Sequence, residues 1–409
     1  MSGRLGEMAR KVPRGLRKLW WTAGVLAENA RGARSPTHSV AVLDDLFPSP
    51  LSGFRMAEYG TYLQAFRDAV VYTSAATQIG EYRSYAELVA DYAREWPELA
   101  PRVLRHHSLR RLRARLGYTM FLNNAVGFVD AFDRSRVPFV FTLYPGGGFR
   151  LDDPASDRKL ERVLGSPWCR RVIATQTITR DYLERRGLCR AEHVAFIYGC
   201  PLPPGGCGDV PAERPRFGMG KPTLDICFVA HRYMPGGADK GYDVFCAAAR
   251  AIGGAVPEAR FHVVGGFDSS DGDLAALGER VRFQGPRESA FLAPFYAGMD
   301  LILSPNAPSL LGPGAFDGFP TASCMEAGRA GVAVFCTDPL GLNVAFEDGR
   351  EIVLIGRDAD AIAEQVLAYR GCPERLAAIG AAGMAAFRRA FGADAQIAPR
   401  IRLLTEELN

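Results

Sequence analysis

Two acidic residues flank a predicted turn and helix start in the part of the sequence best suited to chemistry. Gly318 and Pro320 predict a turn directly before a helix at 321–330. A helix N-terminus offers unpaired backbone N–H groups and the positive end of a dipole, which suit a phosphate. Asp317 and Glu326 lie on either side of this turn, and carboxylates accept hydrogen bonds from sugar hydroxyls. Taken alone, the two acids are better explained as a turn residue and a solvated helix residue.

A second candidate group is cationic. Arg232 follows a predicted strand at 224–230, and Lys240 lies eight residues further on, where the next helix is expected. An Arg at the carboxyl end of a strand and a Lys at a helix start could hold a diphosphate. In isolation this signal is weak, because cations in loops are usually solvated.

The elements that would position these residues alternate as β and α in both halves of the chain. In the first half we expect a basic helical stretch at 84–117, together with strands at 39–43, 70–73, 119–123, 138–143, 172–175 and 194–198. A Pro- and Gly-rich stretch, 200–222, has the composition of a linker. The alternation then restarts with strands at 224–230, 260–264, 281–283, 301–303, 332–336 and 351–355.

Two doubly wound units joined by a hinge place a cleft between the carboxyl ends of their sheets. We therefore predict an α/β protein with four parts: a basic amphipathic segment (1–35), an acceptor domain (36–205), a donor domain (206–390) and a C-terminal helix packing back towards the first domain (391–409). No G-x-G-x-x-G motif follows the first strand of either unit, which disfavours an NAD-dependent enzyme.

An ordered set of motifs runs through the second half of the chain. These are Asp225 to Arg232, Lys240-Gly241, Phe261 to Gly266, Val281 to Gly285, Asp300 to Pro305, Asp317 to Pro320, Glu326 to Val334 and Thr337-Asp338. In order and spacing they resemble the C-terminal domain of family-four glycosyltransferases. The resemblance implies the GT-B fold, with two Rossmann-like domains facing each other across a cleft. It further implies a retaining enzyme that uses a UDP- or GDP-sugar and needs neither a metal nor another cofactor.

The resemblance also assigns roles to residues. Arg232 and Lys240 would grip the donor diphosphate, Glu326 would bind the ribose, and Asp317 would contact the donor sugar. The remaining donor-binding residues would be Gly318, Phe319, Pro320 and Thr321 in the turn, with Gln284 and Arg287 near the nucleobase.

Two features depart from the family pattern. The family has Glu, seven residues and a second Glu, whereas here Asp317 comes first and eight residues intervene before Glu326. In the first half, Tyr144 stands where family members often carry a His. These departures keep a second interpretation open, in which the protein uses the same cleft to bind nucleotide sugars or glycans without catalysing transfer.

Loops of the first half are expected to face the cleft and bind the acceptor or a phosphate. Backbone N–H groups near Ser52 and Gly53 could do this, as could those of the loop after Tyr144, which contains Gly146, Gly147 and Gly148. The alternative for the three glycines is a plain strained turn.

Composition limits the remaining possibilities. The net charge of +4 is too small to indicate a nucleic-acid partner. The nine Cys have no metal-type spacing and are expected to be reduced, as in a cytoplasmic protein. The basic N-terminal segment, with Trp20 and Trp21, could lie on the anionic inner membrane face or pack as a surface helix. A membrane location would suit a glycan or lipid-linked acceptor, as in bacterial surface polysaccharide synthesis.

Overall fold

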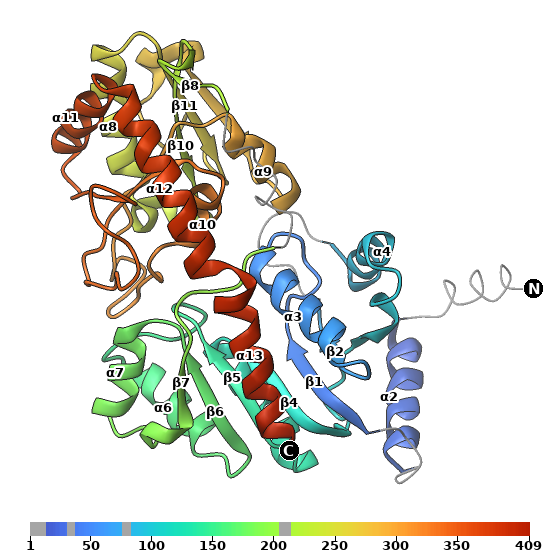
Figure 1. Ribbon diagram of the computed structural model, residues 1–409. Helices are drawn as coiled ribbons and strands as arrows, with labels where there is room; N and C mark the ends of the chain where they lie inside the picture. Colours follow the sequence, from blue (N-terminus) through green and yellow to red (C-terminus); the bar gives the residue numbers. More distant parts are fainter. Residues whose placement is uncertain (1–13, 31–36, 76–82, 204–213) are drawn as a thin grey trace, which may run out of the picture.

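Each half of the chain forms one parallel β-sheet, and the two sheets belong to separate lobes (Figure 1). The computed structural model describes residues 14–30, 37–75, 83–203 and 214–409. The first sheet has the order β3-β2-β1-β4-β5-β6-β7 and the second β12-β11-β10-β13-β14-β15. Both are doubly wound, because the first strand of each sheet lies in the interior and the chain proceeds outwards in both directions. The predicted α/β fold of two Rossmann-like domains is confirmed.

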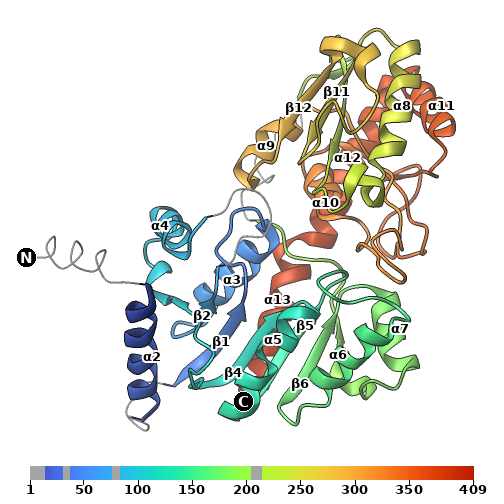
Figure 2. The same ribbon diagram turned by 180° about the vertical axis from the view of Figure 1, so that it is seen from behind.

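The N-terminal lobe contains seven strands and the helices that cover them. The strands are β1 His38–Asp44, β2 Val70–Thr73, β3 Val103–Arg105, β4 Ala114–Met120, β5 Phe139–Leu143, β6 Cys169–Ala174 and β7 Val194–Phe196. The helices are α2 Arg14–Ala30, α3 Gly53–Ala65, α4 Tyr85–Glu95, η2 Ala100–Arg102, α5 Leu122–Ser135, α6 Pro154–Leu164, α7 Thr177–Arg185 and η3 Ala191–His193. Helix α3 lies over the sheet face seen in Figure 1, and α5 and α6 lie over the opposite face, seen in Figure 2.

The C-terminal lobe repeats this architecture. Its strands are β10 Leu224–Val229, β11 Ala259–Val264, β12 Val281–Gly285, β13 Leu301–Ser304, β14 Ala333–Cys336 and β15 Val353–Leu354, preceded by the short pair β8 Arg216–Phe217 and β9 Gly220–Lys221. Its helices are η4 Pro235–Lys240, α8 Tyr242–Ala255, η5 Ala275–Arg280, α9 Ser289–Ala297, α10 Ala322–Arg329, α11 Ala359–Arg370 and α12 Pro373–Phe391.

Strand β10 shows how the sequence builds two buried layers from one strand. Ile226 and Phe228 belong to the apolar cluster beneath α8 and α11, whereas Cys227 between them belongs to the cluster on the other face. Alternate side chains of a strand point to opposite faces, and parallel sheets covered on both faces bury both sets. The near-continuous apolar run of β10 is therefore the pattern expected of a central parallel strand.

The C-terminal helix α13 (Ala393–Leu408) returns to the N-terminal lobe. It follows α12 out of the C-terminal lobe and lies across α3 and β4 (Figure 1). Gln396 in its first turns donates a hydrogen bond from Nε2 to the carbonyl of Tyr198 at 2.6 Å. Two segments therefore connect the lobes, the linker after β7 and the α12–α13 pair.

The basic stretch 84–117 is not helical throughout, so that prediction is wrong beyond residue 95. After α4 the chain forms η2 and the edge strand β3, and β4 begins at Ala114. Pro97 and Pro101 remove backbone donors and clash with a continuing helix, which ends it. Val103 then pairs with Val71 of β2. The arginines between 105 and 115 consequently occupy a loop and strand ends.

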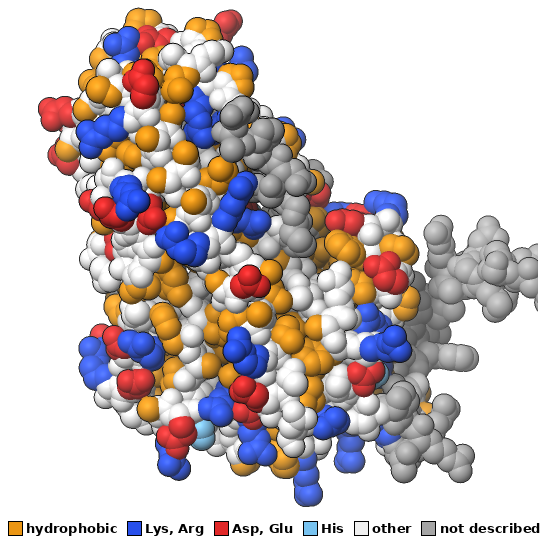
Figure 3. All heavy atoms as spheres, in the orientation of Figure 1, with side chains coloured by type: hydrophobic (Ala, Val, Ile, Leu, Met, Phe, Trp, Pro, Cys, Tyr) orange, Lys and Arg blue, Asp and Glu red, His pale blue; other side chains and the backbone are white. Residues whose placement is uncertain are grey.

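The surface carries both charge signs. On the face shown in Figure 3, acidic and basic side chains are interspersed over both lobes. None of the described helices combines the length and the apolar character that are needed to cross a bilayer.

Candidate active site

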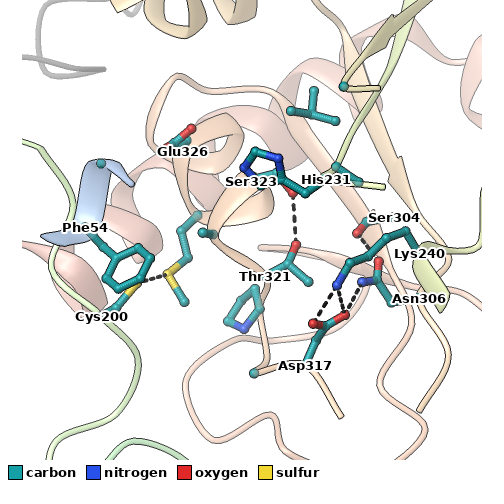
Figure 4. Close-up of a pocket in the computed structure, with 18 of the residues that line it drawn as sticks. Phe54, Cys200, His231, Lys240, Ser304, Asn306, Asp317, Thr321, Ser323 and Glu326 are labelled. Atoms are coloured by element: carbon teal, nitrogen blue, oxygen red, sulfur yellow. Dashed lines mark hydrogen bonds and ion pairs between the residues drawn. The ribbon is translucent and has the colours of Figure 1, made fainter. Parts of the chain in front are cut away.

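A cavity of about 320 Å³ lies between the two lobes, at the carboxyl ends of β10 and β13. These two strands flank the point where the strand order of the second sheet reverses, the usual ligand position in doubly wound folds. The N-terminal lobe contributes Leu51, Gly53, Phe54 and Tyr144 to its lining. The polar lining from the C-terminal lobe includes His231, Lys240, Asn306, Asp317, Thr321, Ser323 and Glu326 (Figure 4).

Lys240 and Asp317 form the main ion pair of this cavity. The Lys240 Nζ atom lies 2.7 Å from both carboxylate oxygens of Asp317, and only 9% of the Lys240 side chain is exposed. Asn306 donates a further hydrogen bond from Nδ2 to Asp317 Oδ2 at 2.7 Å. The Tyr233 ring packs 5.0 Å from Nζ. The structure thus joins two residues predicted for different parts of one donor.

Asn306 has no place in the sequence-based expectation. It lies two residues after the end of β13, and polar residues at the carboxyl end of a central strand are the signal that could have found it.

The N-terminus of α10 opens into the same cavity. Its N-cap residue Thr321 forms no side-chain cap hydrogen bond, and its hydroxyl instead lies 3.1 Å from that of Ser323. The first backbone N–H groups of a helix have no partner within the helix, and both Ala322 and Ser323 line the cavity. This end of α10 therefore presents donors and a positive dipole end to a bound anion.

Glu326 lies one turn further along α10 and also lines the cavity. Its side chain is half-buried. Burial raises the pKa of Glu326 to about 7, and the nearby Arg329 opposes this only partly. Near neutral pH the carboxyl is thus divided between its protonated and ionised forms.

Arg232 is not among the residues that line the cavity, although it was expected beside the donor diphosphate. Its guanidinium lies 2.7 Å from Asp271 and donates to the carbonyl of Gly266. The Asp271 side chain is only 7% exposed, and an almost buried carboxylate retains its cationic partner because an unpaired charge there is costly. The preceding residue, His231, lines the cavity instead.

The remaining donor-side candidates are divided between cavity and core. Gly318, Pro320 and Arg287 line the cavity, whereas Gln284 lies within β12 and is not part of the lining. Phe319 is 4% exposed and packs in the core. Its backbone N–H and carbonyl are both 3.3 Å from the side-chain amide of Gln176 in the N-terminal lobe.

The residues of the two predicted acceptor loops also lie in different places. Gly53 lines the donor cavity, but Ser52 is buried and accepts a hydrogen bond from Arg55 at 3.3 Å. The glycine loop lines a neighbouring cavity of about 880 Å³ that shares Tyr233, Lys240 and Asp317 with the first. All three of its glycines, Gly146, Gly147 and Gly148, have positive φ values, so the backbone conformation itself requires glycine there.

Tyr144 connects the donor cavity to a buried polar network. Its ring lines the cavity, and its hydroxyl donates to Glu58 Oε2 at 2.9 Å. Glu58 also accepts from Tyr62 at 2.9 Å and from Tyr118. Arg400 of α13 is fully buried, with its Nε 3.8 Å from Glu58 and its Nη2 3.3 Å from both Tyr144 and the carbonyl of Gly199. The C-terminal helix therefore reaches the wall of the cavity through this network.

Comparison with known proteins agrees with the fold. Residues 224–369 match the family model described as "Glycosyl transferases group 1". Sucrose-phosphate synthase from Thermosynechococcus elongatus is 16% identical, with a TM-score of 0.61 over 90% of this chain and 99% of that one. No curated protein matches the chain.

Two further solved structures resemble the chain over nearly its whole length. The Anabaena protein HepE, solved in complex with UDP and glucose, is 16% identical, with a TM-score of 0.63 over 91% of this chain and 99% of that one. A glycosyltransferase from Rickettsia africae is 12% identical, with a TM-score of 0.64 over 92% of this chain and all of that one. The fold defines the class: this is a GT-B-fold protein, in which residues 224–369 match the glycosyltransferase group 1 model. The expected GT-B architecture is confirmed, and the narrower family-four, retaining assignment stays a prediction.

Proposed function

We propose that the protein transfers a sugar from a nucleoside diphosphate sugar to a glycan or lipid-linked acceptor, with retention of anomeric configuration. The observation that supports this most directly is the convergence of Lys240, Asp317 and the α10 N-terminus in one interdomain cavity. HepE, solved with UDP-glucose as well as UDP, offers a structural parallel for such a donor. The metal-independent reaction and the role in bacterial surface polysaccharide synthesis belong to the same proposal.

In the proposed mechanism the main contribution of the protein is electrostatic stabilisation of the leaving group. Lys240 and the N–H groups of Ala322 and Ser323 neutralise the departing diphosphate, and donors aimed at developing charge are usually the largest rate term. Lys240 must turn from Asp317 to the diphosphate when the donor binds. The freed Asp317 carboxylate then accepts hydrogen bonds from hydroxyls of the donor sugar, and Glu326 accepts hydrogen bonds from hydroxyls of the ribose. The leaving phosphate takes the acceptor proton, so no protein nucleophile is needed.

The test is incubation with a panel of UDP- and GDP-sugars, followed by NMR of the anomeric protons. We expect one donor to be consumed and the released or transferred sugar to keep the donor's anomeric configuration, with EDTA leaving the rate unchanged. Inversion would contradict the retaining assignment, and loss of activity with EDTA would contradict metal independence. Binding of a nucleotide sugar without any consumption would favour the non-catalytic binding protein.

We also propose that the protein is cytoplasmic and binds the anionic inner membrane face through α2 and the adjoining loop. Leu19 and Leu26 of α2 and Leu109 of the loop are 64%, 51% and 48% exposed. Asn29 of α2 donates to the carbonyl of Leu109 at 2.8 Å, which places the helix against this loop. The arginines of 105–115 would add attraction to anionic lipids.

Of the two tryptophans of α2, Trp21 packs against the protein and is not part of the proposed membrane-binding surface. The Trp21 ring packs at 4.5 Å against His107 and beneath Arg105, so Trp21 anchors the helix to the protein. The side chain of Trp20 and residues 1–13 lie outside the described structure. The exposed leucines are therefore the apolar groups that we propose meet the lipid.

Vesicle sedimentation tests the membrane proposal. The protein should bind vesicles of phosphatidylglycerol and phosphatidylcholine, but not phosphatidylcholine alone, and Leu19→Glu with Leu26→Glu should abolish binding. Val344→Glu, at an exposed apolar site of the C-terminal lobe, is the control and should bind normally. Failure of the unmodified protein to bind anionic vesicles would exclude this part of the proposal.

A further inference from the structure

The residue directly before Arg232 occupies the position where a side chain that binds the diphosphate was expected. His231 is the second residue after β10 and lines the donor cavity together with Lys240, Thr321 and Ser323. Figure 4 draws His231, Ser323 and Lys240 among the side chains that line this cavity. Strand β10 ends where the strand order of the sheet reverses, so His231 lies at the usual ligand position of a doubly wound fold.

Arg232, the other candidate of this loop, binds groups outside the cavity. Arg232 spans from Asp271 at 2.7 Å to the carbonyl of Gly266 at 3.2 Å. Turning it into the cavity would break both the ion pair with Asp271, whose side chain is 7% exposed, and the hydrogen bond to Gly266. His231 makes no such outward pair and is already in the lining.

We propose that His231, and not Arg232, is the side chain of this loop that binds the donor diphosphate, together with Lys240. This inference rests on the proposed function, because it concerns the same donor site. His231 is not among the site residues predicted from the sequence. Beside Lys240, the principal permanent cation at the α10 N-terminus, it adds a group that helps the cavity to hold two negative phosphates.

The environment of the ring suits this role. Burial and the neighbouring Lys240 cation lower the pKa of His231, while a hydrogen bond from the ring to the backbone of Leu51 opposes the lowering. Leu51 belongs to the N-terminal lobe and also lines the cavity. In the free protein the neutral ring has one N–H, which it gives to Leu51.

A bound diphosphate would change the protonation of this ring. An adjacent anion favours the charged imidazolium, which has two N–H donors and can keep Leu51 while donating to a phosphate oxygen. The other titratable or charged side chains of the cavity are Tyr144, Cys200, Tyr233, Lys240, Arg287, Asp317 and Glu326. Proton uptake on binding is therefore assigned by comparing variants and not from the pH profile of the unmodified protein alone.

The test is calorimetric titration of the full-length protein with UDP and GDP, and with uridine and guanosine as probes that lack the diphosphate. His231→Gln should weaken binding of the preferred nucleoside diphosphate by about tenfold or more and leave the nucleoside affinity unchanged. Arg232→Gln, the matched control, should stay within about twofold of the unmodified protein for both probes. Titration in two buffers of different ionisation enthalpy should show fewer protons taken up by His231→Gln.

Several results would overturn this inference. They are unchanged diphosphate binding in His231→Gln, an equal loss for the nucleoside, or a diphosphate-specific loss in Arg232→Gln. His231→Asn replaces His231→Gln if thermal unfolding shows that the latter is not folded. If the unmodified protein binds neither UDP nor GDP, the proposed function itself fails, and that outcome is distinct from a failure confined to His231.

Discussion

The ammonium group of Lys240 lies 2.7 Å from both carboxylate oxygens of Asp317. In the free protein the residue proposed to bind the donor phosphates and the residue proposed to bind the donor sugar therefore neutralise each other. A donor that brings both a diphosphate and a hydroxylated sugar supplies a new partner to each. We therefore predict that substitution of Lys240 affects recognition of the diphosphate, whereas substitution of Asp317 affects recognition of the sugar.

Lys240→Met should remove the main cation from the leaving group. We expect kcat to fall by about 10²–10³, as when one preorganised donor to developing charge is lost. Arg250→Gln changes an exposed cation on the following helix and should leave kcat unchanged. Steady-state rates with the preferred donor decide the matter, and a kcat within about threefold of the unmodified enzyme would remove Lys240 from the mechanism.

Asp317→Asn should separate sugar recognition from phosphate recognition. Without the carboxylate, Lys240 no longer has to leave an ion pair, so UDP or GDP alone should bind as tightly as before or more tightly. The intact nucleotide sugar should lose its advantage over the free diphosphate, because the amide accepts fewer hydroxyl hydrogen bonds. Paired titrations with both ligands test this. A uniform loss for both would show that Asp317 serves only to position Lys240.

Glu326 predicts how affinity for the nucleoside depends on pH. Its pKa is raised to about 7 by burial, so the ionised form that accepts ribose hydroxyls is depleted as pH falls below 7. Uridine or guanosine should bind about tenfold more tightly at pH 8 than at pH 6. Glu326→Gln should make the affinity independent of pH over this range. A pH dependence that persists in Glu326→Gln would assign the titration to another group.

Much of the donor domain can be predicted from sequence because its signals are local. Apolar runs bounded by turns predict β10 and β13, and the Gly-Phe-Pro turn predicts the start of α10. The direction of Arg232 could not be predicted, since it depends on the burial of Asp271, a residue 39 positions away. The same limit applies to 84–117, where helix-favouring composition is overridden by two prolines and by pairing of β3 with β2.

The attachment of α13 is a long-range feature of the same kind. Its composition predicts a helix, but the role of Arg400 depends on residues far away in the sequence, the buried Glu58 above all and the carbonyl of Gly199. Arg400→Met should cost about 3–5 kcal/mol in free energy of unfolding, the usual cost of leaving one charge of a buried pair alone. Arg402→Met, an exposed position on the same helix, should cost less than about 0.5 kcal/mol. Urea denaturation of both variants measures the difference, and equal stabilities would contradict the pairing.

The most direct test of the donor site is thermal unfolding of the unmodified protein with UDP, GDP and their sugars. One nucleoside diphosphate family should stabilise the protein, by about 2.7 kcal/mol at 100 times its dissociation constant. Lys240→Met should lose most of this stabilisation at the same ligand concentration. If no nucleoside diphosphate or nucleotide sugar raises the unfolding temperature of the unmodified protein, the cavity between β10 and β13 is not a donor site.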